Sequence, residues 1–595
     1  MYRYDDFDRA LIRQRAAQYR EQLERWRSGQ LSDDDFRPLR LQNGWYVQRH
    51  APMLRVAVPY GEISARQLRA LARIARDYDQ PEPTRFAAAQ EAQARLEPPS
   101  RLRYGYAHFT TRQNVQFNWI ALEDSADVLD ALAAVDMHGV QTSGNCIRNI
   151  TSDAYAGIAV DEVADPRPFC ELIRQWSTLH PEFAYLPRKF KIAVSGSEED
   201  RAATGWHDLG LTLVRDPRAG SGDDALGFRV AVGGGMGRTP MIAPVLAPFV
   251  PWQHILSYLE AVLRTYNRWG RRDNLYKARI KVLVKSEGAR FAEEVEAEFR
   301  AIVEQDGAPH TISPEALARM RLAFAPPAGL HERKAQPLPE PRPEEAAAFE
   351  RWKARNVHPH RWPHWRAVHL NFKRPGLAPG DATAEQLDAA ADLAERFSAS
   401  EARITHEQNL LLPWVQEHDL LELWRAARAL GLATPTIGLL TDLIACPGGD
   451  YCALANARSL PLAEALLQRW QDVDELEAIG ALDLHISGCI NSCGHHHSGH
   501  IGVLGVDKDG QEWYQITLGG SDGSRLSGPA GPGRVLGPSF AASEVPDAIE
   551  ALIETYLDHR KPGEAFIDTV RRLGLEPFRA AADTARRSQR QAEAA

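Results

Sequence analysis

Long apolar stretches are missing from this chain of 595 residues. The nearest candidate, residues 241–252, is short and is interrupted by three prolines. A membrane-spanning helix needs about twenty predominantly apolar residues, so we expect no such helix. The N-terminus also lacks an apolar signal region, which favours a cytoplasmic location.

An excess of positive charge is missing as well. The formal net charge is −9, which argues against general binding to nucleic acid. The sequence contains no glycine-rich fingerprint for a flavin or nicotinamide cofactor, so any redox chemistry must take its electrons from a partner. The remaining composition, 44% hydrophobic and 25% charged, is typical of globular proteins. The length predicts about three to five domains.

Cysteine is scarce, but its spacing is informative. Of six cysteines, Cys446 and Cys452 form a C-x5-C pair, and Cys489 and Cys493 form a C-x3-C pair. Four converging thiolates can hold an iron–sulfur cluster or a zinc ion, whereas disulfides are rare in cytosolic proteins. Zinc sites usually have shorter gaps, so the first pair favours a cluster. Unrelated buried cysteines are the simplest alternative.

An internal duplication is visible in the order of the predicted elements. A strand at 53–59, a helix at 64–78 capped by Ser64, a strand pair within 104–120 and a helix at 126–135 form a βαββα unit. The same order returns at 367–372, 383–397, 402–414 and 419–430. Residues 111–119 align with residues 405–414, which places His406 opposite Arg112. Such a repeat predicts a pseudo-two-fold molecule with a site at the seam between the halves.

The cysteine motifs carry a family resemblance. C-x5-C followed by G-C-x-N-x-C-G, here at residues 488–494, resembles the signature of the sulfite and nitrite reductases that use sirohaem and a [4Fe–4S] cluster. The resemblance implies that Cys446, Cys452, Cys489 and Cys493 ligate the cluster. It also implies that Cys493 bridges to the sirohaem iron as its axial ligand.

The family resemblance also implies the architecture. The expected fold is α+β and internally duplicated, with two ferredoxin-like βαββα half-domains and two larger mixed α/β domains for sirohaem and the cluster. The expected division is an N-terminal arm at 1–50, a half-domain at 51–136, a sirohaem and substrate domain at 137–325, an extended linker at 326–360, a half-domain at 361–432, a cluster domain at 433–579 and a frayed tail at 580–595.

Two lysines are the first candidates for substrate binding. Along a strand, Lys189 and Lys191 face one side while Phe190 and Ile192 face the other. Two adjacent ammonium groups lower each other's pKa, which suits them to bind an anion and release a proton. A solvated edge strand is the alternative on the pattern alone. The resemblance implies that both lysines line the substrate pocket, together with Arg55 and Arg148, whose guanidinium groups suit the oxygens of small anions.

Further residues are assigned through the same resemblance. Sirohaem is a tetrapyrrole with eight carboxylates, and the positions matching those that contact it are Arg112, Gln116, Arg188 and Arg279. Some relatives carry a covalent tyrosine–cysteine link beside the sirohaem, and Tyr46 and Cys146 fall at the matching positions. An inert pair, with Tyr46 packed and Cys146 buried, is the alternative.

The resemblance implies an assimilatory sulfite reductase that reduces sulfite to sulfide with six electrons from ferredoxin or a flavoprotein subunit. Nitrite reduction to ammonia on the same scaffold is the nearest alternative. Family nitrite reductases tend to have asparagine at the position of Lys191, which favours sulfite here. A precorrin-3B synthase-like enzyme and a non-catalytic zinc-binding protein are more distant alternatives.

Overall fold

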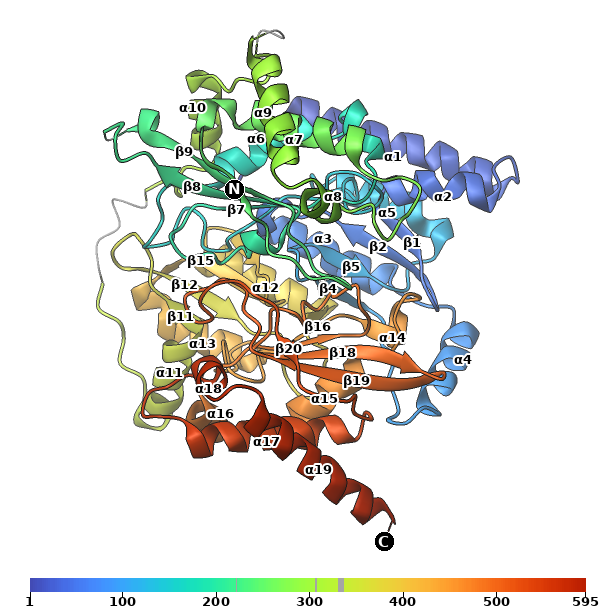
Figure 1. The fold of residues 1–595 in the computed structure, drawn as a ribbon, viewed down its shortest axis with the longest axis vertical. Coiled ribbons are helices and arrows are strands. Elements are labelled where there is room, and N and C mark those ends of the chain that lie inside the picture. The colour runs from blue at the N-terminus through green and yellow to red at the C-terminus, as the bar shows by residue number, and fades with distance from the viewer. Residues whose placement is uncertain (221, 305–307, 330–335, 595) are drawn as a thin grey trace.

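Four five-stranded sheets organise the molecule (Figure 1). The computed structural model describes residues 1–220, 222–304, 308–329 and 336–594. The sheets fall into two similar pairs, one from each half of the chain, as the predicted duplication requires. The α+β, pseudo-two-fold architecture expected from the sequence is therefore confirmed.

The two ferredoxin-like sheets exchange edge strands. In the first, the order is β1 (Trp45–Val47), β2 (Pro52–Val56), β5 (Val115–Phe117), β4 (Tyr106–Phe109) and β13 (Asp381–Thr383). In the second, the order is β11 (Val357–His358), β12 (Trp365–Leu370), β15 (Leu410–Gln416), β14 (Glu401–Ile404) and β3 (Glu62–Ser64). Strand β13 pairs antiparallel with β4, and β3 pairs antiparallel with β14. Each sheet is thus completed by the other half of the chain.

The two larger sheets share one mixed topology. The first contains β6 (Thr151–Ser152), β7 (Ile192–Ser195), β8 (Leu209–Arg215), β9 (Leu226–Val232) and β10 (Val245–Pro251). The second contains β16 (Ile444–Ala445), β17 (Leu484–Ser487), β18 (Ile501–Lys508), β19 (Gln511–Leu518) and β20 (Arg534–Val535). In both, the first three strands are parallel and the last two are antiparallel additions. The carboxyl ends of the parallel strands meet at one edge, where loops can build a site.

Helices α3 (Ala65–Asp77) and α12 (Ala384–Phe397) pack together in the core shared by the two ferredoxin-like sheets. Each begins with a capping box, from Ser64 with Gln67 and from Thr383 with Gln386, which satisfies free N–H groups at the first turn. Separate apolar cores lie in the two larger domains.

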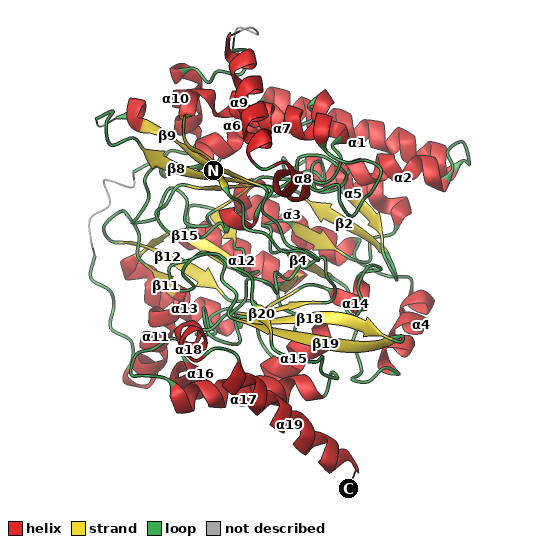
Figure 2. Cartoon of the chain, viewed as in Figure 1, coloured by secondary structure: helices red, strands yellow, loops and turns green. Residues whose placement is uncertain are grey.

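The remaining helices lie mostly around the sheets (Figure 2). They are α1 (Asp6–Arg27), α2 (Asp33–Gln42), α4 (Pro83–Ala94), α5 (Ser125–Ala133), α6 (Arg167–Ser177), α7 (Ile255–Trp269), α8 (Ile280–Glu287), α9 (Ala289–Glu304), α10 (Pro314–Ala323), α11 (Pro343–Asn356), α13 (Leu420–Ala429), α14 (Gly448–Tyr451), α15 (Leu460–Arg469), α16 (Val473–Ile479), α17 (Glu544–His559), α18 (Phe566–Leu573) and α19 (Glu576–Ala594). None of the helices in the described ranges is long and apolar enough to cross a membrane.

Two sequence expectations about connecting segments are wrong. The expected linker at 326–360 contains helix α11 and strand β11, while its residues 330–335 lie outside the described residues. Helix α11 is stabilised by Pro343 in its first turn, acidic residues beside it and basic residues in its last turn. Of the tail expected to be frayed at 580–595, residues 580–594 belong to helix α19, which projects from the body in Figure 2.

Candidate functional site

The two cysteine pairs follow neighbouring parallel strands. Cys446 comes directly after β16, Cys452 closes the short helix α14, and the second pair follows β17. Because β16 and β17 are parallel partners, their carboxyl ends bring both pairs to one edge of the sheet. Burial raises the pKa of the thiols of Cys446, Cys452 and Cys489. The nearby charge of Cys493 raises each of these three pKa values further. The structure therefore brings the four predicted sulfur ligands together.

Glycines allow the two cysteine loops to touch. A Cβ atom at Gly488 would lie 2.7 Å from the Cα of Gly448 and 2.5 Å from the carbonyl oxygen of Ala457. Gly448 also has a φ of +56°, a conformation that favours glycine. The Gly488 carbonyl accepts hydrogen bonds from the N–H groups of Asn456 and Ala457, at 2.9 and 3.0 Å. Larger side chains at either glycine would push the cysteine pairs apart.

A single metal ion and an iron–sulfur cluster make different demands on the four thiols. Within the described ranges, no three His, Cys, Asp or Glu side chains converge on a point that could hold one metal ion. Structural zinc needs its four ligands around one ion. An iron–sulfur cube distributes its four thiolates over several iron atoms, so its ligands can stand farther apart.

Three of the candidate residues donate hydrogen bonds to one backbone atom, the carbonyl oxygen of Thr142. It accepts hydrogen bonds from Tyr46 Oη at 3.3 Å, from Arg55 Nη1 at 3.2 Å and from Arg148 Nη1 at 2.9 Å. Arg55 also donates to Gln116 Oε1 through Nε at 3.0 Å and Nη2 at 2.7 Å, and its guanidinium lies 5.3 Å from the centre of the Tyr46 ring. Burial opposes ionisation of Tyr46, but the two arginines together lower the pKa of its phenol.

Lys189 and Lys191 lie in the same region as Arg55, Arg148 and Tyr46. Phe190 and Ile192 are fully buried while the two lysines are half-buried, as the predicted alternation requires, although β7 itself begins only at Ile192. Burial, and then Arg148, lower the pKa of Lys189 to about 8. Burial, and then Lys189, hold the pKa of Lys191 well below its usual value. Among the described residues, neither lysine side chain has a hydrogen-bond or ion-pair partner.

Further cations surround the lysines. Arg112 uses Nη2 on the carbonyl oxygen of Asn149 at 3.2 Å, but its buried Nε has no partner among the described residues. Burial, and then Arg148, lower the pKa of Arg112 to about 9. Arg279 pairs with Asp208 at 2.6 Å, and burial followed by the charge of Arg279 lowers the pKa of Arg188. The charge of Cys493 acts on Lys189 and that of Arg55 on Cys452, so the cations and cysteines share one site.

This electrostatic arrangement calls for negative charge. Several cationic groups have pKa values depressed by burial and by one another, which means that their charged forms are held at a cost. A bound polyanion would lower that cost and would provide acceptors for the free donors of Arg112 and of the lysines. The residues present therefore fit a cofactor that carries carboxylates, as well as a small anionic substrate.

The histidines after Cys493 make local hydrogen bonds. His496 Nδ1 lies 3.0 Å from Ser492 Oγ, and His497 Nε2 lies 2.9 Å from the carbonyl oxygen of Gly237. His500 Nε2 lies 2.9 Å from Ser527 Oγ. These contacts hold the segment that follows Cys493 against its surroundings and indicate a structural role for the histidines.

Hydrogen bonds in one turn establish how the two halves align. The N–H of Thr110 donates to the carbonyl oxygen of Asn114 at 2.9 Å, and the N–H of Thr405 donates to that of Asn409 at 2.9 Å. The hydroxyls of both threonines accept from the same asparagine N–H groups, at 3.0 and 3.2 Å. Thr110 is therefore the structural counterpart of Thr405.

This register corrects the alignment made from the sequence. The counterpart of Arg112 is Glu407, and the counterpart of His406 is Thr111. The sequence alignment began at the second of two consecutive threonines and was therefore displaced by one residue. Because the charge at this position is reversed in the second half, that half is poorly suited to a second anionic cofactor.

The first half contains a counterpart of the cysteine loops without cysteines. Counted from the ends of the matching strands, Asp153, Ser197 and Arg201 stand where Cys446, Cys489 and Cys493 stand in the second half.

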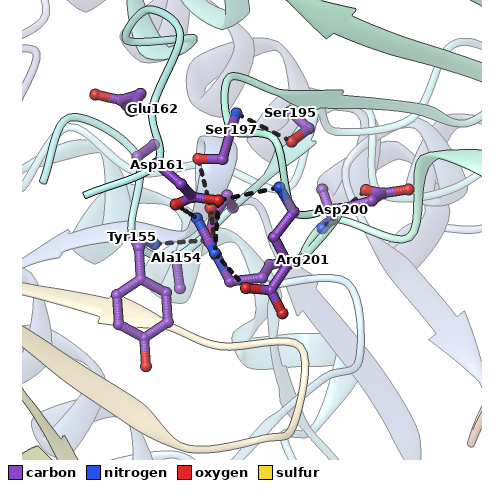
Figure 3. A network of polar contacts seen from close by, with 12 residues as sticks. Ala154, Tyr155, Asp161, Glu162, Ser195, Ser197, Asp200 and Arg201 are labelled. Atoms are coloured by element: carbon purple, nitrogen blue, oxygen red, sulfur yellow. Dashed lines mark hydrogen bonds and ion pairs between the residues drawn. The ribbon is translucent and has the colours of Figure 1, made fainter. Parts of the chain in front are cut away.

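Figure 3 shows that Arg201 occupies the centre of this counterpart as the hub of an ion-pair network. Its guanidinium contacts Asp153 through Nε, Asp161 through Nη2 and Glu199 through Nη1, each at 2.8 Å. Ion pairs thus connect in the first half the loops that carry thiols in the second. The two halves thus have different chemistry at matching positions, with cysteines in the second and an ion-pair network in the first.

Two residues of the site were not found from the sequence. Thr142 acts through its backbone carbonyl, for which side-chain patterns give no signal. Asp208 pairs with Arg279 and accepts the N–H of Lys191 at 3.0 Å. Its only sequence signal is an acidic residue directly before a buried strand.

Comparisons with known proteins identify the family of the chain. The family model "Nitrite and sulphite reductase 4Fe-4S domain" matches residues 143–302 and 440–590, and the "Nitrite/Sulfite reductase ferredoxin-like half domain" matches residues 46–87, 101–135 and 369–430. A relative named sulfite reductase [ferredoxin] 1, from Mycolicibacterium paratuberculosis, is 31% identical over 80% of this chain and 78% of its own.

A ferredoxin–nitrite reductase from Synechococcus elongatus is 29% identical over 84% of this chain and 85% of its own. The solved structure of the Mycobacterium tuberculosis NirA protein superposes with a TM-score of 0.72 at 25% identity and covers 94% of both chains.

Proposed function

Because the chain belongs to the nitrite and sulphite reductase family, we propose that it is an assimilatory sulfite reductase that converts sulfite to sulfide. The observation that carries this choice is the pair Lys189 and Lys191, whose side chains have no partner among the described residues; the charge of Arg148 acts on Lys189 and that of Arg112 acts on Lys191. The second lysine matters because family nitrite reductases tend to have asparagine there. Nitrite reduction to ammonia is the alternative.

The cofactors would be held by residues already described. We propose that Cys446, Cys452, Cys489 and Cys493 hold a [4Fe–4S] cluster, with Cys493 shared with sirohaem. Arg112, Gln116, Arg188 and Arg279 would bind the sirohaem carboxylates. When bound, these two groups supply the single-electron transfers to the substrate sulfur, while the protein supplies binding, orientation and charge.

The substrate would be held by the positive charges of four side chains, two of which are oriented by the Thr142 carbonyl. Arg55 is held by Thr142 and Gln116, and Arg148 is held by Thr142 and Gly144; the N–H groups left over on each guanidinium would meet the substrate oxygens. Lys189 and Lys191 would neutralise the anion, and each would donate one proton from Nζ, which together supply the two protons with which an oxygen leaves as water; solvent would return these protons before the next oxygen leaves. Their lowered pKa values suit them to release that proton.

An electron donor is required because the chain shows no flavin or nicotinamide fingerprint. We propose ferredoxin as that donor, supported by the names of the relatives in Mycolicibacterium paratuberculosis and Synechococcus elongatus. A flavoprotein subunit is the alternative that the sequence left open.

Substrate choice is tested by measuring the steady-state reduction of sulfite and nitrite side by side with a dye donor. We expect a higher kcat/KM for sulfite in the wild type. Lys191→Asn should lower the ratio of sulfite to nitrite kcat/KM by about tenfold or more, because one proton donor and one charge are lost. Lys285→Asn, at an exposed lysine of α8, is the matched control. A wild type that prefers nitrite by a wide margin would show the sulfite assignment to be wrong.

We also propose that Tyr46 and Cys146 are covalently linked. Cys146 Sγ contacts the carbonyl oxygen of Ser143 at 3.1 Å, next to the Thr142 carbonyl that Tyr46 contacts. Forming the bond removes two hydrogen atoms, for which dioxygen is a sufficient acceptor. Proteolytic fragments should therefore remain joined, with a mass lower by two hydrogens than their sum. In Cys146→Ala the two fragments should separate. Two unlinked peptides from the wild-type protein would contradict the proposed covalent link.

A further inference from the structure

Two positions related by the duplication meet across the seam between the halves. Thr111 is the counterpart of His406, and its carbonyl oxygen lies 3.1 Å from His406 Nδ1. The Thr111 hydroxyl donates to the carbonyl oxygen of Cys493 at 2.9 Å. The other ring nitrogen of His406, Nε2, lies 3.1 Å from the carbonyl oxygen of Ser152. A single pair of residues therefore touches both the cluster loop and the first large sheet.

The contact with Ser152 leads toward the lysines. Ser152 lies in β6, which pairs in parallel with β7, and its hydroxyl donates to the carbonyl oxygen of Val194 in β7 at 2.8 Å. Strand β7 begins at Ile192, directly after Lys191. A series of polar contacts thus runs from the backbone of Cys493 through Thr111, His406 and Ser152 to β7, which begins directly after Lys191. Because both His406 contacts are with carbonyl oxygens, a neutral ring donates to one of them and only a doubly protonated ring donates to both.

The local turn does not need the Thr111 hydroxyl. The turn is closed by the neighbouring hydroxyl of Thr110, which accepts the N–H groups of Arg112 at 3.3 Å and of Asn114 at 3.0 Å. Thr111 is only 7% exposed, so water competes little for its hydrogen bond. The Thr111 hydroxyl is therefore free to bind outside the turn. Its partner is the backbone carbonyl oxygen of Cys493, a predicted cluster ligand.

We propose that Thr111 and His406 are positioning residues that hold Cys493 and Lys191 in a fixed relation. This inference rests on the proposed function, in which electrons arrive through Cys493 and protons through the lysines. Both must reach the same substrate atoms, and small displacements of such groups are costly to rate. The second half therefore contributes His406 to the active site as well as its four cysteines.

The test compares Thr111→Val, which removes the hydroxyl at nearly constant volume, with Thr111→Ser, which retains it. The measurements are iron, acid-labile sulfide and sirohaem content, the cluster reduction potential, the electron paramagnetic resonance spectrum and kcat for sulfite. We expect Thr111→Val to keep its cofactors but to show a shifted potential and spectrum, with kcat lower by roughly three- to tenfold. Thr111→Ser should stay within about twofold of the wild type.

The matched control is Thr555→Val in α17, which removes a threonine hydroxyl that donates to the carbonyl oxygen of Ala551 at 2.7 Å, outside the site. It should leave potential and spectrum unchanged. His406→Leu should shift both in the same direction as Thr111→Val. The double variant should add little to the larger single effect, because both residues act in one series of hydrogen bonds.

Two results would overturn the inference in different ways. A wild type that contains no iron, sulfide or tetrapyrrole would refute the proposed function and this inference together. A cofactor-loaded wild type beside a Thr111→Val or His406→Leu protein with unchanged potential and spectrum would refute the positioning role alone, as would strict additivity of the two substitutions.

Discussion

The Cys493→Ser variant is expected to lose sulfite reduction by roughly a thousandfold or more, which corresponds to about 4 kcal/mol of activation free energy. Cys493 is the one exposed thiol of the four predicted ligands, and its charge acts on the other three thiols and on Lys189. A serine oxygen is a poor ligand for an iron–sulfur cluster, which prefers soft thiolates. The substitution therefore removes a cluster ligand and the proposed connection to sirohaem at once.

Iron and sulfide content, the visible spectrum and the magnetic coupling between the two cofactors measure this loss directly. The control is Cys170→Ala, because Cys170 is buried in α6 among apolar residues and is assigned no role in the site. It should retain its cofactors and near wild-type activity. Retention of activity and of cofactor coupling in Cys493→Ser would refute the bridging role.

The cluster motif and the duplication could be predicted from the sequence because both leave local patterns. Cysteine spacing survives in the linear order, and alternating burial around Lys189 and Lys191 follows from strand geometry. The order of helices and strands in each half was also predictable from hydrophobic periodicity. These features depend on neighbours within a few residues, where single-chain reasoning is strongest.

Long-range features could not be predicted in the same way. The exchange of β3 and β13 between the sheets joins segments that are hundreds of residues apart and has no local signature. The one-residue displacement at Arg112 arose because two adjacent threonines fit the repeat equally well, and only hydrogen bonds distinguish them. No sequence pattern indicates that Arg201 is the counterpart of Cys493, because the two residues occupy matching positions in the fold but have different side-chain chemistry.

The second large effect is expected at Lys189. Lys189→Met should lower kcat/KM for sulfite by roughly a hundred- to ten-thousandfold, because it removes both a charge on the anion and a proton donor. Lys189→Arg keeps the charge at every accessible pH, so its KM for sulfite should be close to that of the wild type. It should not recover kcat, because a guanidinium does not release its proton in this range.

The direction of the pH dependence follows from the same lysine. Burial, and then Arg148, lower the pKa of Lys189 to about 8, and only the protonated form can bind the anion and donate a proton. The carboxylates of a resident cofactor would raise that pKa in the substrate-free enzyme, whose ionisation kcat/KM reports, so kcat/KM should be full at lower pH and should fall as pH rises, with a midpoint at or above pH 8. Lys285→Met, at an exposed position on α8, should leave the profile unchanged. A Lys189→Met enzyme with near wild-type kcat/KM would mean that Lys191 and the arginines suffice, and that the lysine pair does not act as a unit.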